Sequence, residues 1–126
     1  MPYINNDVFD EALNLIKNNI DQLDITYSQE ATTATEARTT WTCGNEAIAA
    51  ANCTGPQDGD TDGRELQINA IDDGDVTDTQ TAGWWAISNS TVLHAAGALS
   101  ATQAVTSGNK FTLGAFDITI RDATAV

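Results

Sequence analysis

The chain has 126 residues, of which eighteen are acidic and five are lysine or arginine, so its formal charge at pH 7 is -13. A charge of that sign repels phosphate, and we therefore expect no direct binding to DNA or RNA. No apolar stretch approaches the length of a membrane span, and no basic segment followed by an apolar run opens the sequence. We expect the protein to be made and folded in a cytoplasm, without membrane contact.

The length indicates a single domain over residues 1–126. Residues 1–6 are predicted to be an N-terminal arm, and residues 7–23 an α-helix capped by Asn6 or Asp7, because apolar residues recur every three or four positions. The stripe consists of Phe9, Leu13, Ile16, Ile20 and Leu23, widened by Val8, Ala12 and Leu15. We expect it to pack on the domain's own sheet; the alternative is an exposed stripe that meets a neighbouring subunit.

Residues 25–122 are predicted to form a β domain, because short runs of strand-forming residues alternate with Gly, Asn, Asp and Ser. The predicted elements include an edge strand near 38–42, a half-buried strand at 66–70, an acidic turn at 72–75, a hairpin of 83–88 with 91–99, and a hairpin of 102–106 with 111–113. Strands at this spacing are typical of antiparallel sandwiches and barrels. The predicted fold class is mainly β, an antiparallel β-sandwich or barrel-like domain with one N-terminal α-helix.

The sharpest motif for chemistry is the acidic loop at 58–63. Its alternating Asp58, Asp60 and Asp62 match the opening of an EF-hand calcium loop, in which alternate side chains converge on one cation. The twelfth position is Asn69, which lacks the closing carboxylate, although Glu65 could substitute as a ligand. We expect a solvated acidic turn with no bound metal and no cofactor, and these three aspartates are the candidate ligands if a cation binds.

Nothing in the sequence indicates catalysis. His94 stands alone in a strand pattern, and no serine lies in a Gly-x-Ser-x-Gly elbow, so we expect a non-enzymatic protein. Cys43 and Cys53 are expected to be two half-buried thiols in a reducing cytoplasm; the alternative is a disulfide that closes a small loop.

The adjacent tryptophans Trp84 and Trp85 indicate an interface. Neighbouring residues on a strand face opposite sides, so one ring is expected in the core and the other on the outer face. An outward Trp is a candidate interface anchor, and the alternative is that the N-terminal helix covers it. The candidate interface residues are these two tryptophans together with Tyr3 and Ile4 of the arm.

Most of the chain resembles one family. The segments 3–14, 26–31, 56–64, 86–87, 96–113 and 116–124, taken in order, resemble small virion structural proteins encoded by tailed bacteriophages. The resemblance carries no catalytic residue and implies a structural part of the virion. We expect a capsid decoration, or cement, protein that binds the major capsid protein, commonly as a homotrimer. The alternatives are a neck, tail or fibre-associated subunit, and a carbohydrate-binding β module with an exposed Trp and a calcium loop.

Overall fold

The computed structural model describes residues 3–122, so residues 1–2 of the predicted arm lie outside the described residues. The elements are α1 (Asn6–Asn19), β1 (Gln22–Tyr27), η1 (Glu36–Thr40), β2 (Thr42–Ala47), η2 (Ala50–Asn52), β3 (Cys53–Asp58), β4 (Arg64–Ile68), β5 (Ile71–Val76), β6 (Gln80–Ser88), β7 (Leu93–Val105), β8 (Lys110–Leu113) and β9 (Phe116–Ile120). The predicted fold class is confirmed: the described chain is mainly β, with one N-terminal α-helix.

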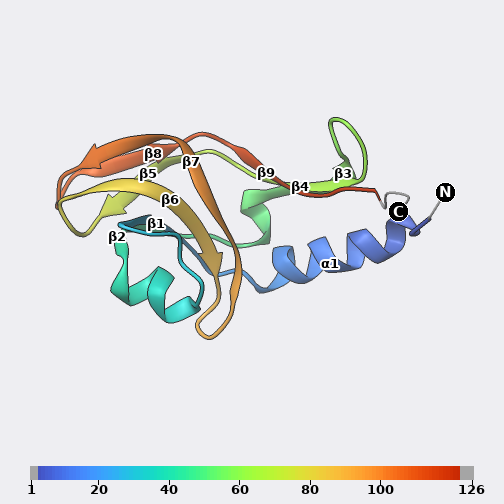
Figure 1. Cartoon of the computed structure of the whole chain (residues 1–126), viewed down its shortest axis with the longest axis horizontal. Coiled ribbons are helices and arrows are strands. Elements are labelled where there is room, and N and C mark those ends of the chain that lie inside the picture. The colour runs from blue at the N-terminus through green and yellow to red at the C-terminus, as the bar shows by residue number, and fades with distance from the viewer. Residues whose placement is uncertain (1–2, 123–126) are drawn as a thin grey trace.

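Six strands form an antiparallel sheet in the order β7-β6-β1-β2-β5-β8, which curves into a half-barrel (Figure 1). β1 lies inside this sheet and pairs with both β2 and β6, so its four central residues, 23–26, are all buried. The predicted hairpin of 83–88 with 91–99 is confirmed by the pairing of β6 with β7. β7 and β8 form the two open edges of the sheet.

A second sheet of three strands, in the order β3-β4-β9, extends from the half-barrel and has α1 beneath it (Figure 1). Leu66 and Ile68 of β4 are buried, and the register places Ile118 and Phe116 of β9 beside them. Residues on a strand alternate between faces, so Glu65 lies on the opposite face. The start of α1 and the end of β9 lie at the same end of the molecule.

One apolar core joins both parts of the molecule. Its buried members come from α1, from the half-barrel and from the three-stranded sheet, and they are Leu13, Ile20, Leu23, Ile25, Cys43, Ile48, Cys53, Leu66, Ile68, Ile71, Val76, Ala82, Ile87, Val105 and Phe111. A smaller cluster, Ala31, Ala37 and Ala86, lies where η1 covers the outer face of the half-barrel. Cys43 and Cys53 are buried free thiols, and burial raises the pKa of Cys43 to about 11.

The predicted helix over 7–23 is too long at its C-terminal end. α1 ends at Asn19, and the backbone of Ile20 is already extended. The helical spacing continues through Leu23, but this residue pairs with Glu46 and Ile87 in the sheet, and that pairing determines its conformation. The cap is also different, because the Asp7 amide donates to the side chain of Asn5 at 2.7 Å.

The edge strand predicted near 38–42 is wrong, because Glu36–Thr40 is a short helical segment of the π type. Local hydrogen bonds hold its start: the Thr32 amide and hydroxyl donate to Glu36 Oε1 at 2.8 and 2.7 Å, and the Glu36 amide donates to Thr33 Oγ1 at 3.1 Å. Such side-chain bonds to nearby backbone groups favour a helix start over a strand.

The predicted turn at 72–75 and the predicted hairpin of 102–106 with 111–113 are also wrong. Residues 72–75 lie within β5, which pairs with β2 and β8. β7 and β8 are not paired, because the turn between them bonds to β5 instead: the Val76 amide donates to the Asn109 carbonyl at 3.0 Å, and the Gly108 amide donates to the Val76 carbonyl at 3.1 Å.

Candidate functional site

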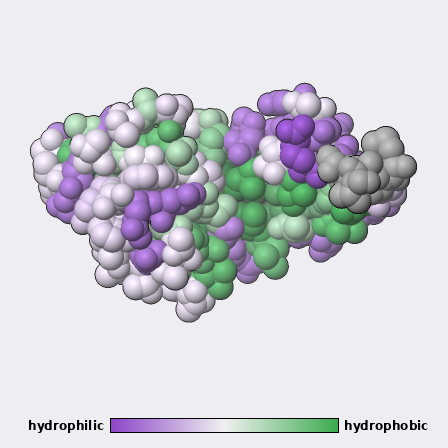
Figure 2. Space-filling view, viewed as in Figure 1, coloured by the Kyte–Doolittle hydropathy of each residue, from purple (hydrophilic) through white to green (hydrophobic). Residues whose placement is uncertain are grey.

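An exposed apolar surface follows the outer side of α1. We define the outer face of α1 as Tyr3, Ile4, Val8, Ala12 and Leu15, all of them exposed. The exposed fraction is 81% for Tyr3, 59% for Val8 and 60% for Leu15. Figure 2 shows hydrophobic residues gathered along α1, at the lower right. Contiguous exposed apolar surface of this kind is typical of sites that contact another molecule.

The opposite side of α1 is held firmly on the three-stranded sheet. Phe9 and Leu13 are buried against it. Arg64 of β4 donates to both carboxylate oxygens of Asp10, at 2.8 and 3.2 Å, and Lys17 donates to the Gly55 carbonyl at 2.8 Å. The outer face is therefore presented by a helix whose inner side is fixed by packing and by polar contacts.

The charges on the exposed side of α1 have one sign. Asp7 and Glu11 are exposed and form no ion pair with any residue in 3–122. Asp10, by contrast, is paired with Arg64, and the one base of the helix, Lys17, turns toward the sheet. The outer face is thus apolar, with uncompensated carboxylates beside it.

The structure separates the four predicted interface residues. Tyr3 and Ile4 belong to the outer face of α1. Trp85 stacks on Phe116, with ring centroids 4.3 Å apart, and packs against the main core. Trp84 is half-buried and has Thr26 and Ala98 as its neighbours across the sheet, so neither tryptophan is a fully exposed anchor.

The sequence interpretation missed the role of Val8, Ala12 and Leu15. It added them to the packing stripe, but they lie on the solvent side of the helix. Two stripes run along α1, and the spacing of these three residues by four and then three is the signal that a separate outer stripe exists.

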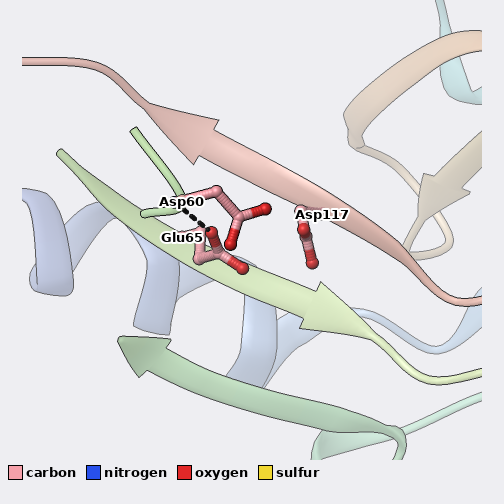
Figure 3. A group of neighbouring side chains, drawn as sticks. All are labelled: Asp60, Glu65 and Asp117. Atoms are coloured by element: carbon pink, nitrogen blue, oxygen red, sulfur yellow. Dashed lines mark hydrogen bonds between the residues drawn. The ribbon is translucent and has the colours of Figure 1, made fainter. Parts of the chain in front are cut away.

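Three carboxylates meet on the polar face of the three-stranded sheet. Asp60, Glu65 and Asp117 each place one oxygen within 4.8 Å of the others (Figure 3). Glu65 is buried and accepts a hydrogen bond from the Asp60 amide at 3.0 Å, while Asp60 and Asp117 are exposed. Hard cations such as calcium bind oxygen ligands of this type. Among the described residues, these are the side chains that could hold a metal ion.

The other two predicted metal ligands point elsewhere. Asp58 pairs with Arg64 at 2.8 Å, and Asp62 pairs with Arg121, whose hydrogen bond lowers the pKa of Asp62. Only Asp60 of the predicted trio therefore reaches the acidic cluster. Asp117 could not be found from the loop motif, because it comes from β9, more than fifty residues further along the chain, where the register pairs it with Gln67, two residues from Glu65.

We expect calcium to leave the melting temperature of this protein unchanged. Calcium takes six to eight oxygen ligands, and the arginine pairs of Asp58 and Asp62 leave only three carboxylates at the cluster. In a chelator, Asp117→Asn should raise the melting temperature, because one of three repelling charges is removed. Thermal melts of both proteins with calcium and with chelator check this. A rise of several degrees with calcium in the parent that Asp117→Asn abolishes would show a bound cation.

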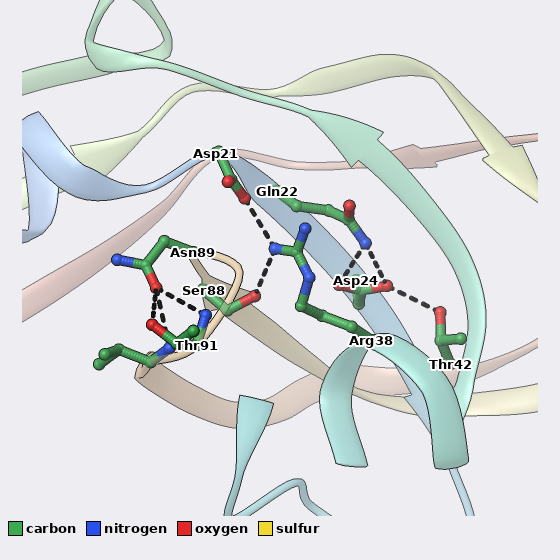
Figure 4. Close-up of polar contacts among 9 residues, drawn as sticks. Asp21, Gln22, Asp24, Arg38, Thr42, Ser88, Asn89 and Thr91 are labelled. Atoms are coloured by element: carbon green, nitrogen blue, oxygen red, sulfur yellow. Dashed lines mark hydrogen bonds and ion pairs between the residues drawn. The ribbon is translucent and has the colours of Figure 1, made fainter. Parts of the chain in front are cut away.

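A buried polar network lies under η1 on the outer face of the half-barrel (Figure 4). Asp24 is fully buried and accepts hydrogen bonds from Thr42 Oγ1 at 2.8 Å and from Gln22 Nε2 at 3.0 Å. Arg38 of η1 donates to Asp21 at 2.7 Å and to Ser88 Oγ at 3.2 Å. Burial raises the pKa of Asp24 to about 6, against the lowering effect of its hydrogen bonds and of Arg38. Within this network it is Arg38 that joins η1 to Asp21 and to Ser88 of β6.

His94 lies half-buried on β7, and its Nε2 has no hydrogen-bond partner among residues 3–122. In the described part of the chain, no helix combines the length and the hydropathy needed to cross a membrane.

A scan against protein-family models finds no match to the chain, and searches of the curated proteins and of the solved structures find none either.

Proposed function

We propose that this protein is a non-enzymatic structural subunit of a tailed-bacteriophage particle, and specifically a capsid decoration, or cement, protein that stabilises the head. The observation that carries the proposal is the outer face of α1, an apolar surface held on a rigid scaffold and left uncovered within the described chain. The sequence resemblance to phage virion proteins supports the same function. The partner is then the major capsid protein, and the protein acts in the virion after synthesis in the host cytoplasm.

The charge of the chain supports a position on the outside of the head. A formal charge of -13 opposes contact with packaged DNA, and it accelerates encounter with a surface of opposite sign. Nothing in the proposal requires a bound metal or cofactor.

Re-addition of the purified protein to particles of the phage that encodes it, stripped of this subunit, tests the proposal. We expect saturable binding, with the protein seen by imaging at repeated positions on the head and a copy number set by capsid symmetry. Density at the neck, tail or fibres would instead show that the protein is a neck, tail or fibre-associated subunit. Absence from every part of the particle would refute a virion role.

We expect the assembled form to be a closed homo-oligomer, and most simply a trimer. β7 is an open edge, and no charged residue occurs from Ala95 to Asn109, so copies of an acidic chain repel one another least along this strand. Light scattering on the free protein and on capsid-bound protein checks this expectation. A strict monomer in both states would contradict it.

The carbohydrate-binding alternative has less support. It depended on an exposed Trp and a calcium loop, whereas Trp84 and Trp85 are both half-buried and two of the three loop aspartates are paired with arginine. We do not propose it.

A further inference from the structure

We propose that the outer face of α1 docks in an apolar groove of a different protein, bordered by lysine or arginine side chains, and that it does not pair with a second copy of this chain. This inference rests on the proposed function, since it specifies the chemistry that the capsid partner must offer to the same surface.

The spacing of the anchors fits a helix lying in a groove. Val8, Ala12 and Leu15 stand at positions i, i+4 and i+7 of α1, so they form one line along its exposed side. Helices that bind in apolar grooves use this spacing of anchors. Ala12, between the two larger side chains, lets the wall of a groove approach the helix backbone.

The charges beside the anchors specify the border of that groove. Glu11 lies next to the line of anchors, three residues after Val8 and four before Leu15, and Asp7 lies one turn before Glu11 on the same side of the helix. Both are exposed and have no ion-pair partner among residues 3–122. The helix offers no base on that side, because Lys17 donates to the Gly55 carbonyl. A lysine or arginine border would compensate these carboxylates, and the overall charge of -13 would speed the encounter with it.

The same charges oppose a second copy as the occupant. Glu11 lies near the middle of α1 and to one side of its outer face, so two α1 helices that pack antiparallel through their outer faces bring the two Glu11 side chains together. Like charges in contact are destabilising, and no base on this side of the helix offsets them.

The size of the surface favours a groove over a flat contact. A stable interface buries about 800 Å² on each partner, and the outer face of α1 comprises five side chains, of which Ile4 is 43% exposed and Ala12 is small. A flat partner would cover only these side chains. A groove also covers the sides of the helix, on one of which Asp7 and Glu11 lie.

The test compares two variants, each with its matched control, for binding to stripped particles, after circular dichroism and melting have shown that each variant folds. Val8→Ser with Leu15→Ser removes the anchors, and Val92→Ser, at another exposed apolar residue, is its control. Asp7→Asn with Glu11→Gln removes the flanking charges, and Asp72→Asn with Asp73→Asn removes the same charge elsewhere on the surface.

We expect the anchor variant to raise the dissociation constant at least about ten-fold and its control to bind like the parent. The flanking-charge variant should associate several-fold more slowly than its control at low salt, and the two should converge near 1 M salt, where the Debye length is about 3 Å. Anchor or charge variants that bind no differently from their controls would overturn this inference and leave the proposed function standing. A parent that binds no part of the particle would overturn both.

A photo-crosslinker in place of Leu15 identifies the occupant directly. The expected crosslink joins α1 to a capsid-protein peptide whose apolar residues are flanked by lysine or arginine. A crosslink between two copies of this chain, or an oligomer of the free protein that Val8→Ser with Leu15→Ser dissociates, would show that a second copy covers the face and would overturn the inference.

Discussion

Leu13→Ala should lower the free energy of unfolding by about 3 kcal/mol, whereas Leu15→Ala, two residues further along the same helix, should change it by less than about 0.5 kcal/mol. Leu13 is fully buried in the core that α1 shares with both sheets, so truncation leaves a cavity beneath the helix. Leu15 is 60% exposed, and its truncation removes little packing within the chain. Urea unfolding of both variants measures the difference.

The order of the two variants should be reversed when their binding to particles is measured. Leu15→Ala should fold like the parent and attach less tightly, because it loses an anchor of the outer face. Leu13→Ala, measured well below its melting temperature, should keep its attachment, because its outer face is unchanged. A loss of stability in Leu15→Ala as large as in Leu13→Ala would mean that the outer face packs within the fold, and the proposed docking surface would then be wrong.

The start of α1 and the hairpin of β6 with β7 could be predicted from the sequence, because both depend on patterns within about twenty residues. The end of α1 could not. Periodicity extends the helix through Leu23, but the residue belongs to β1, whose two neighbouring strands come from distant parts of the chain. Pairing on both sides of β1 outweighs the local helical preference.

The acidic segment of β5 shows how packing can override composition. Asp72-Asp73-Gly74-Asp75 has the composition of a turn, yet it forms a strand. Gly74 permits this arrangement, because the ring of Phe111 on the neighbouring β8 lies where a Cβ atom at this position would be. The aromatic ring buries the glycine backbone and holds the strand in the sheet. The sequence does not show which aromatic residue will pack there.

The sequence could predict only those parts of the candidate site that depend on neighbouring residues in the chain. Tyr3 and Ile4 precede the helix and could be named as an arm, whereas the solvent side of α1 depends on which stripe the three-stranded sheet covers. The buried stripe and the outer stripe are both apolar, so periodicity alone cannot order them. In the structure the stripe with Phe9 and Leu13 is buried and Asp10 pairs with Arg64, so Val8 and Leu15 face outward.

Asp24→Asn should make the protein more stable at pH 7.5 and leave its stability at pH 4 nearly unchanged. Asp24 is fully buried, and burial raises its pKa from 3.8 to about 6 in the folded protein. The Asp24 carboxyl group therefore binds its proton more tightly in the folded state than in the unfolded state. The stability that the group contributes is complete below about pH 4 and is lost as the pH rises through about 6.

An asparagine in this position has no charge to bury. Its Oδ1 can accept the hydrogen bond of Thr42, and rotation of the Gln22 amide provides an acceptor for its amide group. A shift of this size corresponds to at most about 3 kcal/mol of unfolding free energy, since one pKa unit is about 1.4 kcal/mol. The gain at pH 7.5 should approach that limit only if the new hydrogen bonds are as good as the old ones.

Urea unfolding of the parent and of Asp24→Asn at pH 4 and pH 7.5 measures this effect, with Asp72→Asn as the control for removing one charge from an acidic chain. The parent should lose stability relative to Asp24→Asn between the two pH values, and the control should not reproduce that difference. A variant that is equally destabilised at both pH values would mean that the fold requires the hydrogen bonds that the Asp24 carboxylate accepts from Thr42 and Gln22. The ionised carboxylate would then stabilise the fold. The free-energy cost of burying its charge would be smaller than the stabilisation from the hydrogen bonds that it accepts.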